Sequence, residues 1–353
     1  MVKFIRKLNL WVILFTLLAY IAPYISPTQM SFLMFVGVAF PWLLVINIVF
    51  FLLWALSRLR YWWYSAVVIL LGWSHITSIF GVHFGANTEG AANRQKIRVL
   101  SYNICGGISP NTKNKIFGRL ALSQFLEKQN ADVLCVQEFV LQWGEQWHKQ
   151  MLDDIPFLKT YPYWIRLEGN DLAIFSRFPI QNAGTLINRK KSNGCTYADI
   201  LLNEQTIRFY SVQLQSNIVS DIADDLVKKQ DIIDDDSWFS VGRMLTRFRR
   251  AGIVRAKDSE LLKKHMNESP YPIVVCGDFN DIPVSYTYNV LAEGLTDNFQ
   301  QTGKGFGTTY AGHIPALRID YILMSPKLTP LSCAILREPH SDHYPVVSDI
   351  LIN

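Results

Sequence analysis

The amino-acid sequence predicts an α/β domain with packed sheets, preceded by transmembrane helices. From position 97 to 351, apolar runs of strand length recur between turn residues, and helical apolar spacing occurs between some of them. Mixed strands and helices over about 260 residues are typical of a single α/β domain. The first 88 residues differ, because they contain no Asp or Glu and consist mostly of three long apolar runs.

The three apolar runs are each long enough to cross a membrane, which takes about 20 apolar residues. They extend over Leu8–Ile25, Met30–Leu56 and Tyr61–Phe84. Basic residues precede the first run, as in a signal peptide, but two more apolar runs follow it directly, which favours a retained anchor. We therefore expect residues 1–88 to form a membrane anchor of about three transmembrane helices and residues 95–353 to form the globular domain.

The charges of the expected anchor predict its orientation. All of them are positive: Lys3, Arg6, Lys7, Arg58 and Arg60. Because basic loops are retained in the cytoplasm, we expect the N-terminus and the second short loop to lie there. Three spans then place the residues after Glu89 outside the cytoplasm. The expected protein is a multi-pass plasma (inner) membrane protein whose globular domain is extracytoplasmic.

The charge balance of the globular part differs from that of a general nucleic-acid binder. The chain has 34 Lys+Arg and 29 Asp+Glu, and the five positive charges of the anchor account for the whole surplus. A general DNA-binding protein usually carries a basic surplus that replaces counterions. The five cysteines show no C-x-x-C spacing, so we expect buried thiols rather than a disulfide framework.

The globular part contains eight expected strands and two expected helices. The strands are Ile97–Ile104, Val133–Gln137, Leu172–Phe175, Tyr197–Leu202, Ile207–Leu214, Ile273–Cys276, Arg318–Met324 and Val346–Leu351, and the helices are Ile116–Gln129 and Arg249–Met266. Residues 216–240 are irregular and rich in Asp, and several Arg residues follow them. We interpret this segment as a solvated loop and helix. A flap facing the substrate, or an element touching the membrane surface, is the alternative, because Trp238 and Phe248 are costly to expose.

Two clusters of polar residues follow or precede strand-like runs. Asp278 and Asn280 come at the end of the run 272–276, where alternation places both side chains on one face of the sheet edge. Open α/β sheets place their chemistry at such strand ends. The second cluster, Asp342 and His343, directly precedes the last strand. An acid beside an imidazole suits metal-assisted attack of water on a phosphate.

Three further polar residues occupy strand positions. Glu138 ends the run 132–137, and a carboxylate there suits a hard divalent cation, which takes oxygen ligands. Asn103 ends the first strand, where it contacts a phosphate or caps a turn. Asp320 lies inside an apolar strand and needs a polar partner. His343 is the candidate partner, and the carboxylate would fix its tautomer and raise its basicity.

Six short blocks, in this order along the chain, resemble the endonuclease/exonuclease/phosphatase superfamily. They are Ser101-Tyr102-Asn103, Val136-Gln137-Glu138, Asp171–Ser176, Gly277–Asp281, Arg318–Ile322 and Ser341-Asp342-His343. The resemblance covers nearly all of 97–353 and leaves out the expected anchor. It implies a four-layer α/β sandwich of two mixed sheets flanked by helices.

The resemblance also implies roles for the clustered residues. Glu138 would bind Mg²⁺, for which Mn²⁺ is a possible substitute, with Asn103 and Asp342 close to the ion. Asp278 and Asn280 would position the attacking water and the phosphate. His343, oriented by Asp320, would activate the water or stabilise the developing charge. Asn170 would reach a phosphate oxygen.

One position departs from the superfamily pattern. Gln213 stands in Gln213-Leu214-Gln215-Ser216, where many members have a histidine. Glutamine can donate a hydrogen bond to a phosphate oxygen but cannot deliver a proton to the leaving group. We expect cleavage to persist and to favour good leaving groups. The structural alternative for Gln213 is an ordinary half-exposed strand residue.

The predicted function is that of a membrane-anchored, Mg²⁺-dependent phosphodiesterase or phosphatase. Its expected partners are the lipid bilayer and a phosphoester substrate, which is a lipid head group, a nucleotide or an oligonucleotide, and no obligate protein partner is evident. One alternative is an extracytoplasmic nuclease that scavenges DNA or RNA. The other is a non-catalytic domain that binds a phosphorylated ligand or a protein, although clustered carboxylates without a metal would repel one another.

Overall fold

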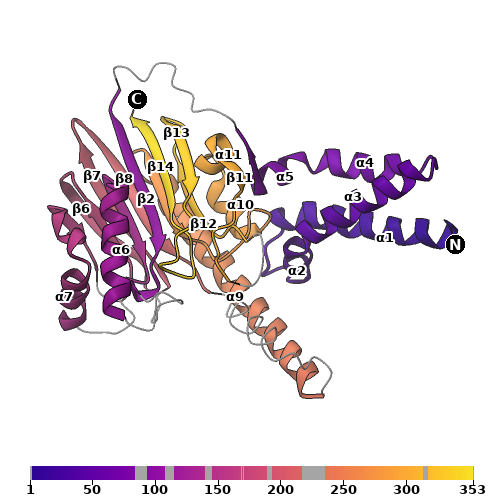
Figure 1. The fold of residues 1–353 in the computed structure, drawn as a ribbon, viewed down its shortest axis with the longest axis horizontal. Helices are drawn as coiled ribbons and strands as arrows, with labels where there is room; N and C mark the ends of the chain where they lie inside the picture. The colour runs from indigo at the N-terminus through magenta and orange to yellow at the C-terminus, as the bar shows by residue number, and fades with distance from the viewer. Residues whose placement is uncertain are drawn as a thin grey trace.

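Two six-stranded sheets, packed against each other, form the larger part of the molecule, and a group of helices projects from one side of it (Figure 1). The structure is a computed structural model, and it describes residues 2–83, 94–107, 115–139, 145–167, 169, 171–188, 193–216, 235–312 and 317–352. We call residues 2–79 the helical region and residues 96–352 the sandwich.

The first sheet has the strand order β13-β14-β2-β3-β5-β4. The bounds are β13 (Leu328–Ile335), β14 (Val346–Ile352), β2 (Lys96–Asn103), β3 (Val133–Gln137), β5 (Ala173–Ser176) and β4 (Tyr163–Ile165). Only β2 and β3 run parallel among these neighbours, with Asn103 opposite Gln137 at their ends. The two strand ends therefore deliver residues 103 and 138 to the same edge.

The second sheet has the strand order β10-β12-β9-β8-β7-β6. The bounds are β10 (Thr296–Asp297), β12 (Asp320–Met324), β9 (Ile273–Asp278), β8 (Gln205–Gln213), β7 (Gly194–Leu202) and β6 (Ile180–Asn188). The parallel pair β8 and β9 ends with Gln213 opposite Asp278, and antiparallel β12 begins with Asp320 opposite Asp278. Three polar side chains thus meet at one edge of this sheet.

The core between the sheets consists of the inward-facing residues of both. Val99 and Val133 of the first sheet and Phe209 and Val274 of the second are completely buried in one cluster. Helices cover the outer faces: α6 (Lys115–Gln129) and α7 (Glu145–Asp154) pack on the first sheet, and α9 (Asp235–Asn267) and α10 (Tyr286–Ala292) pack on the second. The sandwich therefore has the layers helix, sheet, sheet and helix, which confirms the predicted fold of the globular domain.

The helical region contains one helix that is long and apolar enough by itself to cross a membrane. This helix is α1 (Val2–Ile21), continued by the turn η1 (Ala22–Tyr24). The helices α2 (Phe32–Val38) and α3 (Phe40–Leu56) pass the same test only as a pair bent by 58°. The third apolar run does not form one helix. Gly72 separates α4 (Trp62–Leu71) from α5 (Trp73–Ile79), and Phe80–Val82 forms the strand β1, which pairs with β11 (Lys304–Phe306).

Polar side chains lie inside the helical region and apolar ones outside it. Asn9 of α1 donates from Nδ2 to Ser65 Oγ of α4 at 3.0 Å, and it accepts from Trp54 Nε1 of α3 at 3.0 Å. On the outside, Phe4 is 72% exposed and Leu56 is 83% exposed. Buried polar residues that join helices, combined with an apolar exterior, are features of helices packed in lipid.

One apolar cluster joins the helical region to the sandwich. Val36 and Phe40 of the helical region are buried in it together with Ile282 and Val284 of the sandwich. A Cβ placed on Gly37 of α2 would lie 3.1 Å from the carbonyl oxygen of Val284, so the two parts approach closely there. The Asp-rich stretch 217–234 of the segment predicted to be a solvated loop and helix lies outside the described residues.

An ion-pair group on the neighbouring inner strands β2 and β14 of the first sheet predicts an acid-sensitive contribution to stability. Arg98 Nε lies 2.8 Å from Asp349 Oδ1, and Lys96 Nζ lies 2.9 Å from Oδ2. Burial alone would raise the pKa of Asp349, but Arg98 and Lys96 outweigh it and hold this pKa below its ordinary value of 3.8. The stabilisation is therefore present above the pKa of the unfolded chain and is lost as the pH falls through the folded pKa.

We expect Asp349→Asn to lower the melting temperature near neutral pH. The difference in melting temperature between the wild type and the variant should become smaller as the pH falls towards about 3, because the wild-type carboxylate is then protonated and uncharged. Thermal unfolding of the full-length protein in detergent at both pH values measures this. A difference that stays the same at both pH values would contradict the expectation.

Candidate active site

The site lies where β2, β3, β8 and β9 end and β12 begins. Gly277 has a φ of 146°, and a Cβ at this position would lie 1.9 Å from the carbonyl oxygen of Val212 in β8. Only glycine allows β8 and β9 to lie this close in this conformation. The close approach sets Gln213 and Asp278 at one level, as their register shows.

Two residues of the site have left-handed backbone conformations. Glu138 has a φ of 51° and Asn280 a φ of 52°. Asparagine adopts this region readily, but glutamate does so less often and at a cost of ~1 kcal/mol or more. Hydrogen bonds hold the turn at Glu138, whose carbonyl oxygen accepts from Gly106 N at 2.8 Å. The turn directs the Glu138 carboxylate towards the ends of β2 and β8, where its partners lie.

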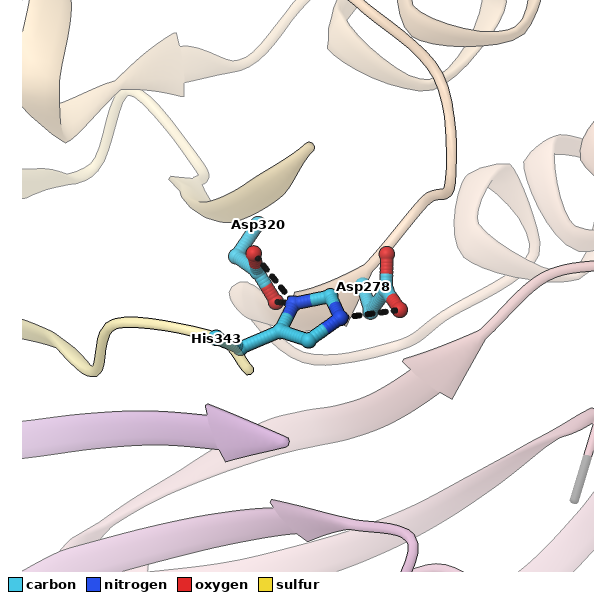
Figure 2. A group of neighbouring side chains, drawn as sticks. All are labelled: Asp278, Asp320 and His343. Atoms are coloured by element: carbon cyan, nitrogen blue, oxygen red, sulfur yellow. Dashed lines mark hydrogen bonds and ion pairs between the residues drawn. The ribbon is translucent and has the colours of Figure 1, made fainter. Parts of the chain in front are cut away.

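His343 lies between two aspartates (Figure 2). Its Nδ1 is 2.9 Å from Asp320 Oδ2 and 3.2 Å from Oδ1, and its Nε2 is 3.8 Å from Asp278 Oδ2. All three side chains are buried. With Asp320 accepting the proton on Nδ1, Nε2 is the nitrogen directed towards Asp278.

The pKa values of the buried groups follow from burial and from one another. Burial raises the pKa of Asp278 to about 8, and the charges of Asp320 and Glu138 add to this rise. His343 and the backbone N–H of Asn280 act in the opposite direction. Burial would lower the pKa of His343, but the charges of Asp320 and Asp278 outweigh it and raise this pKa well above 6.5. The carboxylates therefore repel one another, and a positive charge beside them relieves the repulsion.

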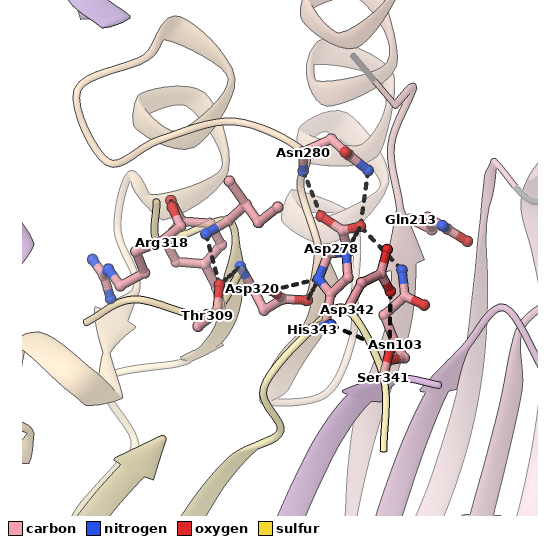
Figure 3. Close-up of polar contacts among 12 residues, drawn as sticks. Asn103, Gln213, Asp278, Asn280, Thr309, Arg318, Asp320, Ser341, Asp342 and His343 are labelled. Atoms are coloured by element: carbon pink, nitrogen blue, oxygen red, sulfur yellow. Dashed lines mark hydrogen bonds and ion pairs between the residues drawn. The ribbon is translucent and has the colours of Figure 1, made fainter. Parts of the chain in front are cut away.

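Amide groups link the carboxylates at the strand ends. Asn103 Nδ2 donates to Glu138 Oε1 at 3.1 Å and to Asp278 Oδ2 at 3.3 Å, and Gln213 Nε2 donates to Glu138 Oε1 at 2.6 Å. Asn280 Nδ2 donates to Asp278 Oδ2 at 2.9 Å. The side chains of Glu138 and Asp278 thus share Asn103 as a donor. Figure 3 shows Asn103 and Asn280 beside the carboxylate of Asp278.

The structure places the other predicted residues as follows. Asp342 is half-buried and lies beside Asn103 and Ser341 (Figure 3), with its Oδ1 3.1 Å from Ser341 Oγ. Gln213 is completely buried rather than half-exposed, and it contacts Glu138. Asn170 lies outside the described residues. The structure therefore brings together every other residue predicted for the site.

Two residues that support the site were not predicted from the sequence. Thr309 Oγ1 accepts from Ile319 N at 2.9 Å and from Asp320 N at 3.0 Å, which fixes the start of β12. Ser341 Oγ donates to the carbonyl oxygen of Asn103 at 2.8 Å, which ties the loop before His343 to the end of β2. Ser341 precedes Asp342 in the motif, which was a usable signal. Thr309 lies in a loop without a pattern and gave none.

Ligand atoms of three buried residues are close enough to hold a metal ion. One ligand atom each from Asp278, Asp320 and His343 lies within 4.8 Å of the others. Glu138 is a third acidic group, joined to Asp278 by the shared donor Asn103. This carboxylate-rich donor set fits a hard divalent cation such as Mg²⁺, which takes oxygen ligands.

Comparisons with known families and structures agree with this geometry. The sequence profile of the Endonuclease/Exonuclease/phosphatase family matches residues 100–343, and a profile described as a domain of unknown function, DUF8431, matches residues 2–79. No curated protein sequence matches the chain significantly.

Solved structures of this family share the fold. A family protein from Bacteroides thetaiotaomicron is 17% identical, with a TM-score of 0.51 over 74% of this chain and 99% of that one. A Bacteroides vulgatus protein is 17% identical, with a TM-score of 0.53 over 74% and 100%. D. rerio TDP2, solved with a single-strand DNA product, is 16% identical, with a TM-score of 0.50 over 72% and 99%.

The fold and the match to the family profile identify the sandwich as an α/β phosphoesterase domain. The chain belongs to the Endonuclease/Exonuclease/phosphatase family, whose members are generally metal-dependent phosphoester hydrolases.

Proposed function

We propose that the protein is a membrane-anchored, Mg²⁺-dependent hydrolase of phosphoesters. The observation that carries this proposal is the meeting of Glu138, Asp278 and the Asp320–His343 pair at the strand ends, from positions far apart in the chain. Acidic groups packed this closely are costly without a cation.

Glu138 and Asp278 are the proposed metal ligands, with Asn103 and Asp342 at the edge of the ion site. In the structure the Asn103 nitrogen faces both carboxylates, while its Oδ1 accepts from Cys105 N at 3.1 Å. Asn103 therefore holds the two carboxylates together. A bound Mg²⁺ supplies positive charge that stabilises the charge developing on the phosphoryl oxygens.

The Asp320–His343 pair is the proposed general base. Asp320 holds the Nδ1 proton of the imidazole and raises the pKa of His343, so Nε2, once it has lost its proton, is a strong base towards water. The water oxygen forms a bond to phosphorus as the bond from phosphorus to the ester oxygen breaks, and the leaving alkoxide takes a proton from solvent water to become the alcohol. Asn280, which donates to Asp278, helps to orient that carboxylate towards the attacking water.

Gln213 is proposed to support Glu138, since it donates to this carboxylate at 2.6 Å. We expect Gln213→Val to weaken Mg²⁺ affinity about tenfold while the rate at saturating Mg²⁺ stays close to that of the wild type. Hydrolysis of a 4-nitrophenyl and an alkyl ester across a Mg²⁺ titration measures this. A loss confined to the alkyl ester at saturating Mg²⁺ would instead indicate that Gln213 contacts the phosphate or the leaving group.

The helical region is proposed to insert in the membrane as three passes: α1, the bent pair α2 and α3, and the pair α4 and α5. Its N-terminus and the α3–α4 turn lie together at the end far from the sandwich (Figure 1), and Arg6 Cζ lies 5.4 Å from the ring centre of Tyr61. The positive charges of the region are thus gathered at one end, which the positive-inside rule assigns to the cytoplasm. The sandwich then lies on the extracytoplasmic side.

Metal removal tests the proposed activity. The full-length protein in detergent should hydrolyse bis(4-nitrophenyl) phosphate with Mg²⁺ or Mn²⁺, and EDTA should abolish the activity in a way that added Mg²⁺ reverses. Single-stranded DNA, used as a substrate in the same assay, tests the nuclease alternative. D. rerio TDP2, which shares this fold, was solved with a single-strand DNA product. Phosphoester binding without hydrolysis in either metal would favour the binding-domain alternative.

A further inference from the structure

The candidate active site lies next to the end of the helical region that contacts the sandwich. Ile282 follows Asn280 by two positions, and Ile319 directly precedes Asp320. Both isoleucines are buried in one cluster with apolar residues of α1, α2 and α3, namely Ala19, Val36 and Phe40. The residues that flank the site therefore also form the contact with the helical region.

A second connection passes through the loop before β12. Tyr310 belongs to the same cluster, and it forms a β-bridge with His343. The Tyr310 ring lies 5.7 Å from the imidazole in an edge-on arrangement, at an interplanar angle of 76°. The imidazole is thus one residue away from the apolar contact with the helical region.

The length of α1 sets the level of this contact in a membrane. After Lys7, the last cationic residue of α1, the apolar helix continues from Leu8 through the turn η1 to Tyr24, and these residues at about 1.5 Å each span roughly 25 Å, close to the thickness of the hydrocarbon layer. Because the cationic end of the region marks one membrane surface, the end that carries Ala19 lies at the other surface. The active site is then next to the membrane surface rather than held away from it on a linker.

The first half of α9 extends along the same end of the helical region. The Phe248 ring of α9 packs 5.2 Å from the Phe35 ring of α2, and Figure 1 shows α9 extending from the sandwich past α2. This half exposes four arginines, Arg243, Arg247, Arg249 and Arg250, together with the apolar side chain of Leu245. Basic and apolar side chains at a membrane surface favour anionic lipid head groups, by about 1 kcal/mol for each basic residue.

The arginine that follows this half connects α9 to the site. Buried Arg255 donates from Nε to Asp281 Oδ2 at 3.2 Å and from Nη1 to the carbonyl oxygen of Gln215 at 3.0 Å. Asp281 directly follows Asn280, and Gln215 follows Gln213 by two positions. A head group bound by the arginines of residues 242–250 in α9 is therefore close to the strand ends that carry the site.

From these contacts, and resting on the proposed function, we infer that the substrate is a phosphoester of an anionic membrane lipid. Residues 242–250 of α9 attract this lipid, and it is cleaved without leaving the bilayer. Moving a lipid chain from the bilayer into water costs ~0.8 kcal/mol for each CH₂ group, so the enzyme has to bind the phosphoester at the membrane surface. Water attacks phosphorus and gives its proton to His343, the bond from phosphorus to one ester oxygen breaks, and the departing alkoxide takes a proton from solvent water. Cleavage of a soluble nucleic acid would require neither a site next to the membrane surface nor the basic residues of α9 at that surface.

The test uses the full-length protein in nanodiscs of phosphatidylcholine with phosphatidylglycerol or phosphatidic acid. We expect Mg²⁺-dependent hydrolysis of an anionic lipid, and a specificity for single-stranded DNA well below that for the lipid. Arg247→Glu/Arg250→Glu should lower the lipid rate about tenfold or more and leave hydrolysis of soluble bis(4-nitrophenyl) phosphate unchanged. Arg177→Glu, at an exposed arginine that contacts Asn130, is the matched control and should change neither rate.

Failure of this inference differs from failure of the proposed function. Hydrolysis of the soluble diester without hydrolysis of either lipid would overturn the lipid inference alone, as would preference for DNA or an equal effect of the α9 variant on both substrates. An α9 variant that leaves the lipid rate unchanged would do the same. Absence of hydrolysis of every substrate would overturn the proposed function.

Discussion

Asp278→Asn should lower the rate of phosphoester hydrolysis by a factor of about 10²–10⁴ while the protein stays folded. Asp278 contacts Asn103, Asn280 and His343, so the carboxylate is part of both the proposed ion site and the water site. Asparagine keeps the shape of the side chain and removes its charge. The measurement is the Mg²⁺-dependent rate on bis(4-nitrophenyl) phosphate for the full-length variant in detergent.

The direction in which Asp278→Asn changes the stability of the metal-free protein follows from the pKa of this carboxyl. Burial raises the pKa of Asp278 to about 8, so ionising this carboxyl in the metal-free protein opposes folding, and stability falls as the pH rises through this value. Removing the charge should therefore not lower the melting temperature at pH above about 8 in EDTA. Asp153→Asn, at an exposed position of α7, is the matched control and should retain the full rate. Full activity of Asp278→Asn would contradict the proposed site.

Gly277→Ala should destabilise the protein by several kcal/mol and reduce its activity at the same time. The added Cβ would lie 1.9 Å from the carbonyl oxygen of Val212 and 2.8 Å from its nitrogen, both of which are backbone atoms of β8. Because β8 would have to move away, the register that sets Gln213 opposite Asp278 would be disturbed. Thermal unfolding and the hydrolysis rate together measure the effect.

Gly242→Ala provides the control for this prediction. Gly242 lies in α9, and a Cβ added there meets no atom within 4 Å. Alanine is favoured over glycine in a helix by about 1 kcal/mol, so this variant should be as stable as the wild type or slightly more so. Equal stability of the two alanine variants would show that the approach of β8 and β9 is less close than the structure indicates.

The strand ends that form the site could be predicted because each carries a local signal. Asp278 and Asn280 follow an apolar run, and Asp320 interrupts one, and the observed β9 and β12 begin or end at these residues. All eight expected strands occur within a few residues of their predicted bounds. Their buried positions alternate or run continuously, as in central strands of a packed sheet.

Edge elements could not be predicted in the same way. β6 is rich in polar residues and β13 contains Pro330, because an edge strand needs neither a continuous apolar run nor every backbone donor. The expected helix Arg249–Met266 is the second half of a longer α9, whose first half projects beyond the sandwich. The contact between the helical region and the site involves a few apolar residues from each of several separate segments, and no local pattern marks such a contact.

Binding of Mn²⁺ to the full-length protein, followed by electron paramagnetic resonance, tests the central claim most directly, because it reports on the ion and not on any chosen substrate. We expect saturable binding that Mg²⁺ displaces, and strong weakening in Glu138→Gln and Asp278→Asn, while Asp153→Asn binds as the wild type does. Binding that is undetectable in the wild type, or that is unchanged in both site variants, would contradict the proposed metal site.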